Sequence, residues 1–285
     1  MDVKTQSDPA EVSNEIRAQK PGSDKGQEGW FGFFSYFTKL ILIVLIFRSF
    51  VFSPFSIPSE SMVPQLWNGD YLLAAKWPYG FSKYSMPFSA QLVPGRILAN
   101  QPKRGDVVIF KHPIDKQDYI KRVIALPGDT ISVIGGQVVL NGKLVTREPI
   151  SDFDIPISAN TDCAWGGDEI ILESGDAACR YKRFRETLPS GRTYEVLDFG
   201  LRPSHDTFKE KTVPEGEMFV MGDNRDFSQD SRFDASAGNG VGMVDQDLLV
   251  GRAAILIWST DGSAQWAQPW TWVTAARWNR IGSLL

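Results

Sequence analysis

The sequence predicts a mainly β fold: a single N-terminal transmembrane helix, then a β-rich domain with a smaller inserted β-domain. Two observations predict it. One long apolar run lies near the start of the chain of 285 residues. After it, short β-branched and aromatic runs alternate with Gly and Pro, and no long amphipathic helix pattern follows.

The N-terminal region predicts a polar tail and a membrane anchor. Residues 1–29 are polar and mixed in charge, as in a disordered tail. Residues 30–53 contain the apolar run, and about 20 helical residues span a hydrocarbon core. A central Lys39 raises the free energy of membrane insertion by about 3 kcal/mol, and each Leu, Ile or Phe lowers it by about 0.3–0.6 kcal/mol. Arg48 lies near one end of the run, and its side chain can extend to the interface. No small-x-small site follows, so we expect an uncleaved anchor; a buried core helix is the alternative.

The later elements are short strands in two regions. Residues 54–150 and 213–260 predict the β-rich domain, in which residues 131–145 read as a three-stranded meander turning at Gly135-Gly136 and Asn141-Gly142. Residues 151–212 predict an inserted β-ribbon domain, with paired strands Tyr181–Thr187 and Thr193–Phe199.

The last segment, residues 261–285, is rich in Trp and contains Arg277 and Arg280. It is too short and polar to span a membrane. Trp favours the membrane interface, so one interpretation places the segment on a bilayer surface; the other packs it on the domain.

The bulk composition excludes some functions. A net charge of −4 argues against a nucleic-acid partner, because binding phosphates needs clustered Lys and Arg. Two His and two scattered Cys make no metal pattern, and we expect no metal or cofactor. Cys163 and Cys179 fit a disulfide if the domain faces an oxidising compartment; two free thiols are the alternative.

Ser61 and Lys121 are the candidates for nucleophilic catalysis. Ser61 lies between Pro58 and Pro64, shortly after the end of the apolar run. A serine nucleophile needs a base, and neither His112 nor His205 has a supporting motif. A lysine serves only when burial lowers its pKa, and Lys121 lies in an apolar strand pattern. The alternative is an edge-strand lysine that points to water.

The run Gly222-Asp223-Asn224-Arg225-Asp226-Phe227-Ser228-Gln229-Asp230-Ser231-Arg232 follows an apolar strand pattern. Taken alone, it reads as a polar turn with ion pairs. No Glu at the twelfth position completes a calcium-binding loop.

Read together, these segments resemble bacterial type I signal peptidases, which use a Ser-Lys dyad. The resemblance covers about residues 35–258 and rests on motifs that follow the anchor in order. They are Ile57-Pro58-Ser59-x-Ser61-Met62-x-Pro64, Arg104-Gly105-Asp106-Val107-Val108-x-Phe110, the run Tyr119–Asp129, and the run Gly222–Arg232.

The resemblance implies a role for each matching residue. Ser61 is implied as the nucleophile, Lys121 as the neutral general base and Ser59 as an oxyanion donor. Ser228 is implied to orient Lys121, and the pair Asp230 and Arg232 to support the site. The implied pockets for small substrate side chains are lined by Phe55, Ile57, Pro58, Met62, Leu66, Asp118, Tyr119 and Ile120.

The implied reaction is cleavage of signal peptides from exported preproteins after a small-x-small motif. The implied partners are these preproteins and the lipid bilayer. The implied location is the bacterial inner membrane, with one span, a cytoplasmic tail and a periplasmic catalytic domain. Three departures stand out: Glu60 where glycine is common, Phe227 where a polar residue is frequent, and a Gly/Ala-rich loop at residues 234–242.

Two other functions are compatible with parts of the sequence. A self-cleaving Ser-Lys peptidase uses the same chemistry, but the anchor and the lack of a DNA-binding helical domain argue against it. A non-catalytic anchored β-domain does not require Lys121 to lie beside Ser61, so the distance between them separates these hypotheses.

Overall fold

The computed structural model describes residues 25–85, 95–163 and 166–285, with the side chains of residues 25–29 excepted. The expected disordered tail lies, up to residue 24, outside the described residues. Contacts divide the chain into two units, residues 1–44 and residues 45–285. The mainly β prediction is confirmed, because nearly all regular structure of the second unit is strand.

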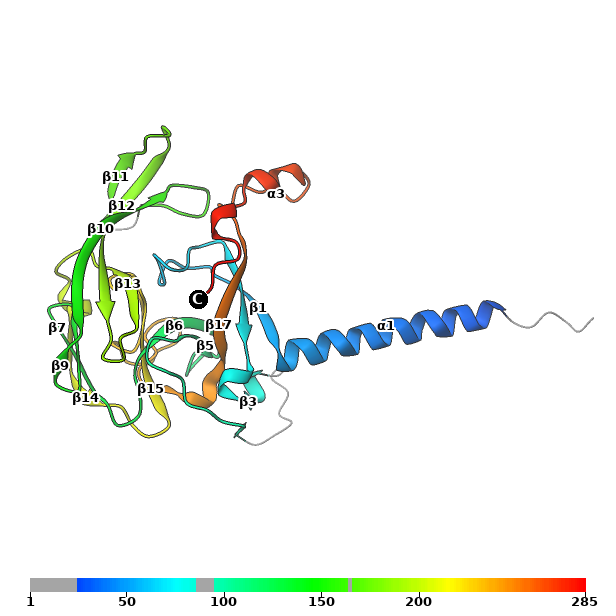
Figure 1. Ribbon diagram of the computed structural model, residues 1–285, viewed down its shortest axis with the longest axis horizontal. Helices are drawn as coiled ribbons and strands as arrows, with labels where there is room; N and C mark the ends of the chain where they lie inside the picture. The colour runs from blue at the N-terminus through cyan, green and yellow to red at the C-terminus, as the bar shows by residue number, and fades with distance from the viewer. Residues whose placement is uncertain (1–24, 86–94, 164–165) are drawn as a thin grey trace, which may run out of the picture. The chain divides into compact units, whose positions relative to one another are not determined.

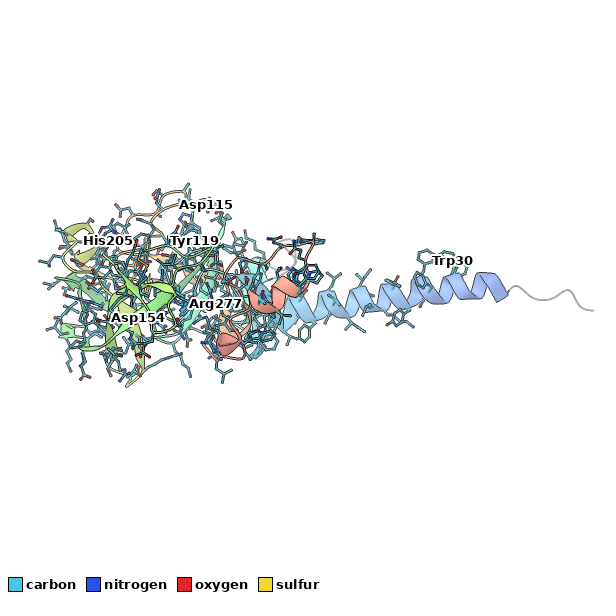
Figure 2. The ribbon with its side chains drawn as sticks, turned by 90° about the horizontal axis from the view of Figure 1, so that it is seen from above. Trp30, Asp115, Tyr119, Asp154, His205 and Arg277 are labelled. Carbon is cyan, nitrogen blue, oxygen red and sulfur yellow. A yellow bond between two sulfur atoms is a disulfide. The ribbon has the colours of Figure 1, made fainter. Side chains whose placement is uncertain are left out.

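Helix α1 (Lys25–Phe50) contains the apolar run. Its residues Trp30–Phe50 are long and apolar enough to cross a membrane. Large apolar side chains are exposed all along it, and Figure 2 shows Trp30 projecting near its start. A helix that is apolar all round needs an apolar surrounding, and lipid supplies one. The helix begins five residues before the expected anchor and ends at Phe50, because a strand starts at Phe52.

The central sheet has seven antiparallel strands in the order β1-β2-β17-β5-β6-β15-β16 (Figure 1). Its strands are β1 (Phe52–Ser56), β2 (Asp70–Ala75), β17 (Leu249–Ser259), β5 (Val107–Lys111), β6 (Asp118–Ala125), β15 (Glu217–Met221) and β16 (Val244–Asp245). Alternate side chains of β5 enter two different core clusters, Val107 and Ile109 one, Val108 and Phe110 the other. The sheet is therefore covered on both faces.

A second sheet contains the expected meander. Its four strands, in the order β14-β7-β8-β9, are β14 (Thr207–Thr212), β7 (Thr130–Ile134), β8 (Gln137–Leu140) and β9 (Lys143–Leu144). Gly135 and Gly136 have φ of 55° and 77°, and Asn141 and Gly142 have φ of 52° and 73°. Positive φ at both central residues is the geometry of tight hairpin turns, so these residues set the register.

The third sheet lies mostly in the expected insert. Its strands are β10 (Thr146–Pro156), β11 (Asp168–Ile171), β12 (Ala177–Thr187) and β13 (Thr193–Leu197). The long strands β10 and β12 run side by side, and β12 pairs with β13 as the sequence predicts (Figure 1). The sheet starts at Thr146 rather than at residue 151, and β14 pairs with β7 outside the insert. The domain boundaries stay a prediction.

Short elements complete the second unit. They are strands β3 (Phe81–Ser82) and β4 (Arg96–Ile97), helices α2 (Pro203–Asp206) and α3 (Trp270–Thr274), and the 3-10 helices η1 (Trp77–Tyr79), η2 (Lys83–Ser85), η4 (Gln246–Leu248) and η5 (Trp278–Arg280).

Arginines tie the C-terminal segment to the domain. Arg280 forms an ion pair of 2.5 Å with the buried Asp70, and Arg277 donates to the carbonyl of Asn68 over 2.8 Å. The Trp side chains of this segment nevertheless do not pack into the core of the domain: Trp266 is 92 % exposed and Trp270 is 67 % exposed.

Candidate active site

Ser61 lies in a compact turn that follows β1. The Val63 N–H donates to the Glu60 carbonyl over 3.1 Å, and the Leu66 N–H donates to the Met62 carbonyl over 2.9 Å. Met62 and Leu66 are four residues apart and both enter the core cluster that contains Ile57. The buried side chains hold the turn in place, and Ser61, 6 % exposed, lies at the wall of a cleft.

Lys121 lies in the middle of the central sheet. Its strand, β6, is flanked by β5 and β15, and Lys121 faces Val108 in the register with β5. The side chain is only 4 % exposed. Lys121 is therefore not the edge-strand lysine of the alternative interpretation.

The two side chains meet although 60 positions separate them. Lys121 Nζ donates a hydrogen bond of 2.7 Å to Ser61 Oγ. Burial lowers the pKa of Lys121 to about 8, although Asp230 and Asp223 nearby favour the charged form. A lysine with this pKa is neutral in a substantial fraction of molecules near pH 8 and can then accept the serine proton.

A second hydroxyl and a backbone N–H adjoin the Ser61 hydroxyl. Ser59 Oγ lies 3.4 Å from Ser61 Oγ. Within the described part of the chain, no group accepts a hydrogen bond from the Ser61 N–H. A hydroxyl and a free backbone N–H beside the nucleophile are suited to stabilise an oxyanion on an attacked carbonyl.

The loop after β15 clamps the turn at residues 60–66, which we call the nucleophile turn after the role that the resemblance implies for Ser61. The Asn224 N–H donates to the Ser61 carbonyl over 3.1 Å, and Asn224 Nδ2 donates to the Glu60 carbonyl over 3.2 Å. Gly222 permits this approach: a Cβ there would lie 2.3 Å from Ser228 Oγ and 2.4 Å from the Ser61 carbonyl oxygen. The sequence assigned a role to neither Asn224 nor Gly222, although both belong to the run Gly222–Arg232 that carries the resemblance.

Ser228 and the ion pair of Asp230 and Arg232 lie in the same loop. Asp230 and Arg232 form a fully buried ion pair of 2.9 Å, as the resemblance implies, and Arg232 helps to hold the pKa of Asp230 below its usual range despite burial. Ser228 is buried and lies close enough to Asp230 to favour the charged form of that carboxyl. Its Oγ, however, is not within hydrogen-bond geometry of any group in the described residues. The bond to Lys121 is thus not formed here, and the orienting role of Ser228 stays a prediction.

An apolar cleft of about 310 Å³ leads to Ser61 and Lys121. Most of the expected pocket residues line it: Phe55, Ile57, Pro58, Asp118, Tyr119 and Ile120. Met62 and Leu66 do not, because the turn directs both into the core beneath the cleft. The sequence did not place five other lining residues there: Ser56, Ile109, Gln117, Phe227 and Gln229.

The remaining candidates lie outside the cleft. Cys163 and Cys179 form a disulfide. His112 Nε2 forms a hydrogen bond with the Gly240 carbonyl, and its ring lies tilted against Tyr119. His205 contacts Phe233, so neither histidine serves Ser61. Among the described residues, no group of three or more His, Cys, Asp or Glu side chains is placed to hold a metal ion.

A mainly β fold with a buried lysine hydrogen-bonded to a serine indicates a serine peptidase in which lysine replaces the usual histidine. Comparison with known sequences gives the family. The chain belongs to the signal peptidases, peptidase family S26, whose sequence model matches residues 30–258.

Curated relatives carry the same description. Signal peptidase I of Rickettsia typhi (strain ATCC VR-144 / Wilmington) is 34% identical over 227 residues, which cover 76% of this chain and 75% of that protein. Signal peptidase I of Rickettsia canadensis (strain McKiel) is 35% identical over the same shares. A solved signal peptidase I from Enterococcus faecalis V583 aligns with 54% of this chain and 97% of its own, at 23% identity and a TM-score of 0.29.

Proposed function

We propose that this protein is a membrane-bound serine endopeptidase that cleaves N-terminal signal peptides from exported preproteins after a small-x-small motif. The hydrogen bond of 2.7 Å between Lys121 Nζ and Ser61 Oγ is the observation that supports it most directly. A non-catalytic anchored domain does not require this contact. Membership in the signal peptidase family supports the substrate class.

The proposed reaction is acyl transfer. Ser61 Oγ attacks the carbonyl of the scissile bond while neutral Lys121 takes the serine proton. Ser59 and the Ser61 N–H stabilise the oxyanion, and Lys121 gives its proton to the leaving amine. Water, deprotonated by Lys121, then releases the signal peptide from Ser61. The walls formed by Ile57, Tyr119 and Ile120 restrict the cleft and favour small substrate side chains.

Cleavage of a preprotein by purified full-length protein in lipid vesicles tests this function. Ser61→Ala and Lys121→Ala are each expected to abolish cleavage, with the protein still folded. Matched controls are Ser174→Ala and Lys209→Ala, both exposed and outside the cleft, which are expected to cleave normally. Cleavage retained in either dyad variant would exclude the proposed mechanism.

The proposed location is the bacterial inner membrane, with α1 as a single span and the β-rich unit on the periplasmic side. The apolar surface of α1 supports the span, and the disulfide agrees with an oxidising compartment. Protease added to spheroplasts tests the orientation: it should reach the β-rich unit, and protection of that unit would reverse the assignment.

We also propose that the C-terminal segment, residues 261–285, lies in the membrane interface. The exposed Trp266 and Trp270 support this, while Arg277 and Arg280 tether the segment to the domain. A photoactivatable phospholipid in vesicles with the full-length protein should label residues 266–272. Labelling confined to α1 would favour a segment that only packs on the domain.

A further inference from the structure

Phe227 is an exposed aromatic side chain in the wall of the catalytic cleft. It is 43 % exposed and lines the same cleft as Ser61 and Lys121. Its neighbours in sequence, Asp226 and Ser228, are polar and buried. A large apolar side chain presented to solvent inside a cleft is typical of a surface that binds a ligand.

Two rings from the inserted sheet region stand behind Phe227. The ring of Phe199 lies 6.4 Å from that of Phe227, and Tyr181 stacks on Phe199 at 4.9 Å. We call Tyr181, Phe199 and Phe227 the aromatic row. Gly166 and Gly167 lie against it so closely that a Cβ at either position would come within 2.4 Å of Phe199 or Tyr181. The row is therefore closely packed at its inner end and open at Phe227.

Hydrogen bonds fix the backbone that presents Phe227. Asp226 Oδ2 accepts from the Phe199 N–H over 2.7 Å, and the Asp226 carbonyl accepts from Arg202 Nη1 over 2.6 Å. The Phe227 N–H donates to the Asn224 carbonyl over 3.3 Å. The backbone at Phe227 is therefore already ordered, and no ordering of this loop is needed when a ligand packs on the side chain.

We propose that Phe227 is a specificity-determining residue, which packs against one apolar side chain of the preprotein close to the scissile bond. This inference rests on the proposed function. Because Phe227 lines the same cleft as Ser61, the substrate side chains that reach it are those close to the bond that Ser61 attacks. The inserted sheet region then has a role in substrate choice, because it supplies two of the three rings.

The test uses full-length protein in vesicles and a series of preproteins with Leu or Asn at one position. The positions are the second residue before the scissile bond and the first and second residues after it. The wild-type protein is expected to favour Leu by about tenfold in kcat/KM at one of them, as one buried apolar group does. Phe227→Asn should lose this preference, and Phe227→Leu should keep part of it.

The matched control is Ile171→Asn, which changes another exposed apolar residue on β11, outside the cleft, and should keep the preference. An equal rate change at all three positions, or no change at any, would overturn the inference while cleavage itself upholds the proposed function. Labelling of Phe227 in the wild-type protein by a photoactivatable phospholipid, with the Leu preference unchanged in Phe227→Asn, would indicate a lipid contact instead. A wild-type protein that cleaves none of the series would overturn both proposals.

Discussion

Glu186 holds Arg225 through two hydrogen bonds of 2.8 and 2.6 Å, and both side chains are buried. Glu186 lies in β12 of the third sheet, and Arg225 lies in the loop that also contains Asn224 and Ser228. The Tyr194 hydroxyl donates to the same carboxylate over 2.8 Å. The contact therefore fastens the inserted sheet to the loop that clamps the nucleophile turn.

Glu186→Gln is expected to destabilise the protein by about 3–5 kcal/mol, because it removes the ion-pair partner of the buried Arg225 charge. Chemical denaturation in detergent measures the free energy of unfolding. The matched control is Asp154→Asn at the exposed pair with Arg180, which should cost at most about 1 kcal/mol. Equal effects of the two changes would contradict the importance of burial.

Lys121→Met is expected to lower kcat by about 10³-fold or more while leaving stability unchanged or raised. Methionine fills a similar volume without placing a charge in the core of the sheet. Thermal unfolding and preprotein cleavage, measured on the same sample, check both parts. A variant that lost stability together with activity would indicate a structural role for Lys121.

The pH dependence of cleavage should follow Lys121. Its pKa is about 8, so kcat/KM is expected to rise as pH passes through about 8 and the amine loses its proton. The unfolded chain keeps that proton up to about pH 10.4, so it binds more protons than the folded protein between these values. This group's contribution to stability should therefore rise with pH across that window. In Lys121→Met the rise in stability should be absent.

Gly222→Ala is expected to reduce kcat/KM by about 10²-fold or more, because displacing the reacting groups by even about 1 Å has an effect of that size. The new Cβ would collide with the Ser61 carbonyl oxygen and with Ser228 Oγ. Gly32→Ala, in open space on α1, is the control and should cleave normally. Normal activity of Gly222→Ala would mean that the two segments do not approach as closely as the structure places them.

Replacing both Cys163 and Cys179 by Ser should lower the free energy of unfolding by about 3 kcal/mol, the chain-entropy value for a loop of about 15 residues. The disulfide lies in a core cluster with Val63, which belongs to the nucleophile turn. The variant should therefore lose cleavage activity at a lower temperature than the wild-type protein. Denaturation with and without a thiol reductant measures the change. Identical curves in the wild-type protein would argue against a stabilising disulfide.

The sequence predicts local structure well in this chain, because local patterns determine it. The apolar run gives α1, and the Gly and Asn residues of the meander give the two hairpin turns with positive φ. The resemblance also selects Ser61 and Lys121, which the structure brings together.

Strand order lies beyond such patterns. An alternating strand pattern reads the same at an edge and at the centre, and β6 is central only because β5 and the distant β15 pair with its two sides. Met62 was expected in a pocket, yet the turn directs it into the core. Phe227 lies against the ring of Phe199, whose N–H donates to Asp226, and no local pattern reveals either contact.

The burial of Lys121 also makes cutting conditional on folding. In an unfolded or half-assembled chain this lysine is solvated, and at pH 7 only about one molecule in a few thousand lacks its proton. The amine becomes a useful base only after β5, β6 and β15 have paired around it. A newly made chain is thus expected to gain its peptidase activity only when the central sheet has formed.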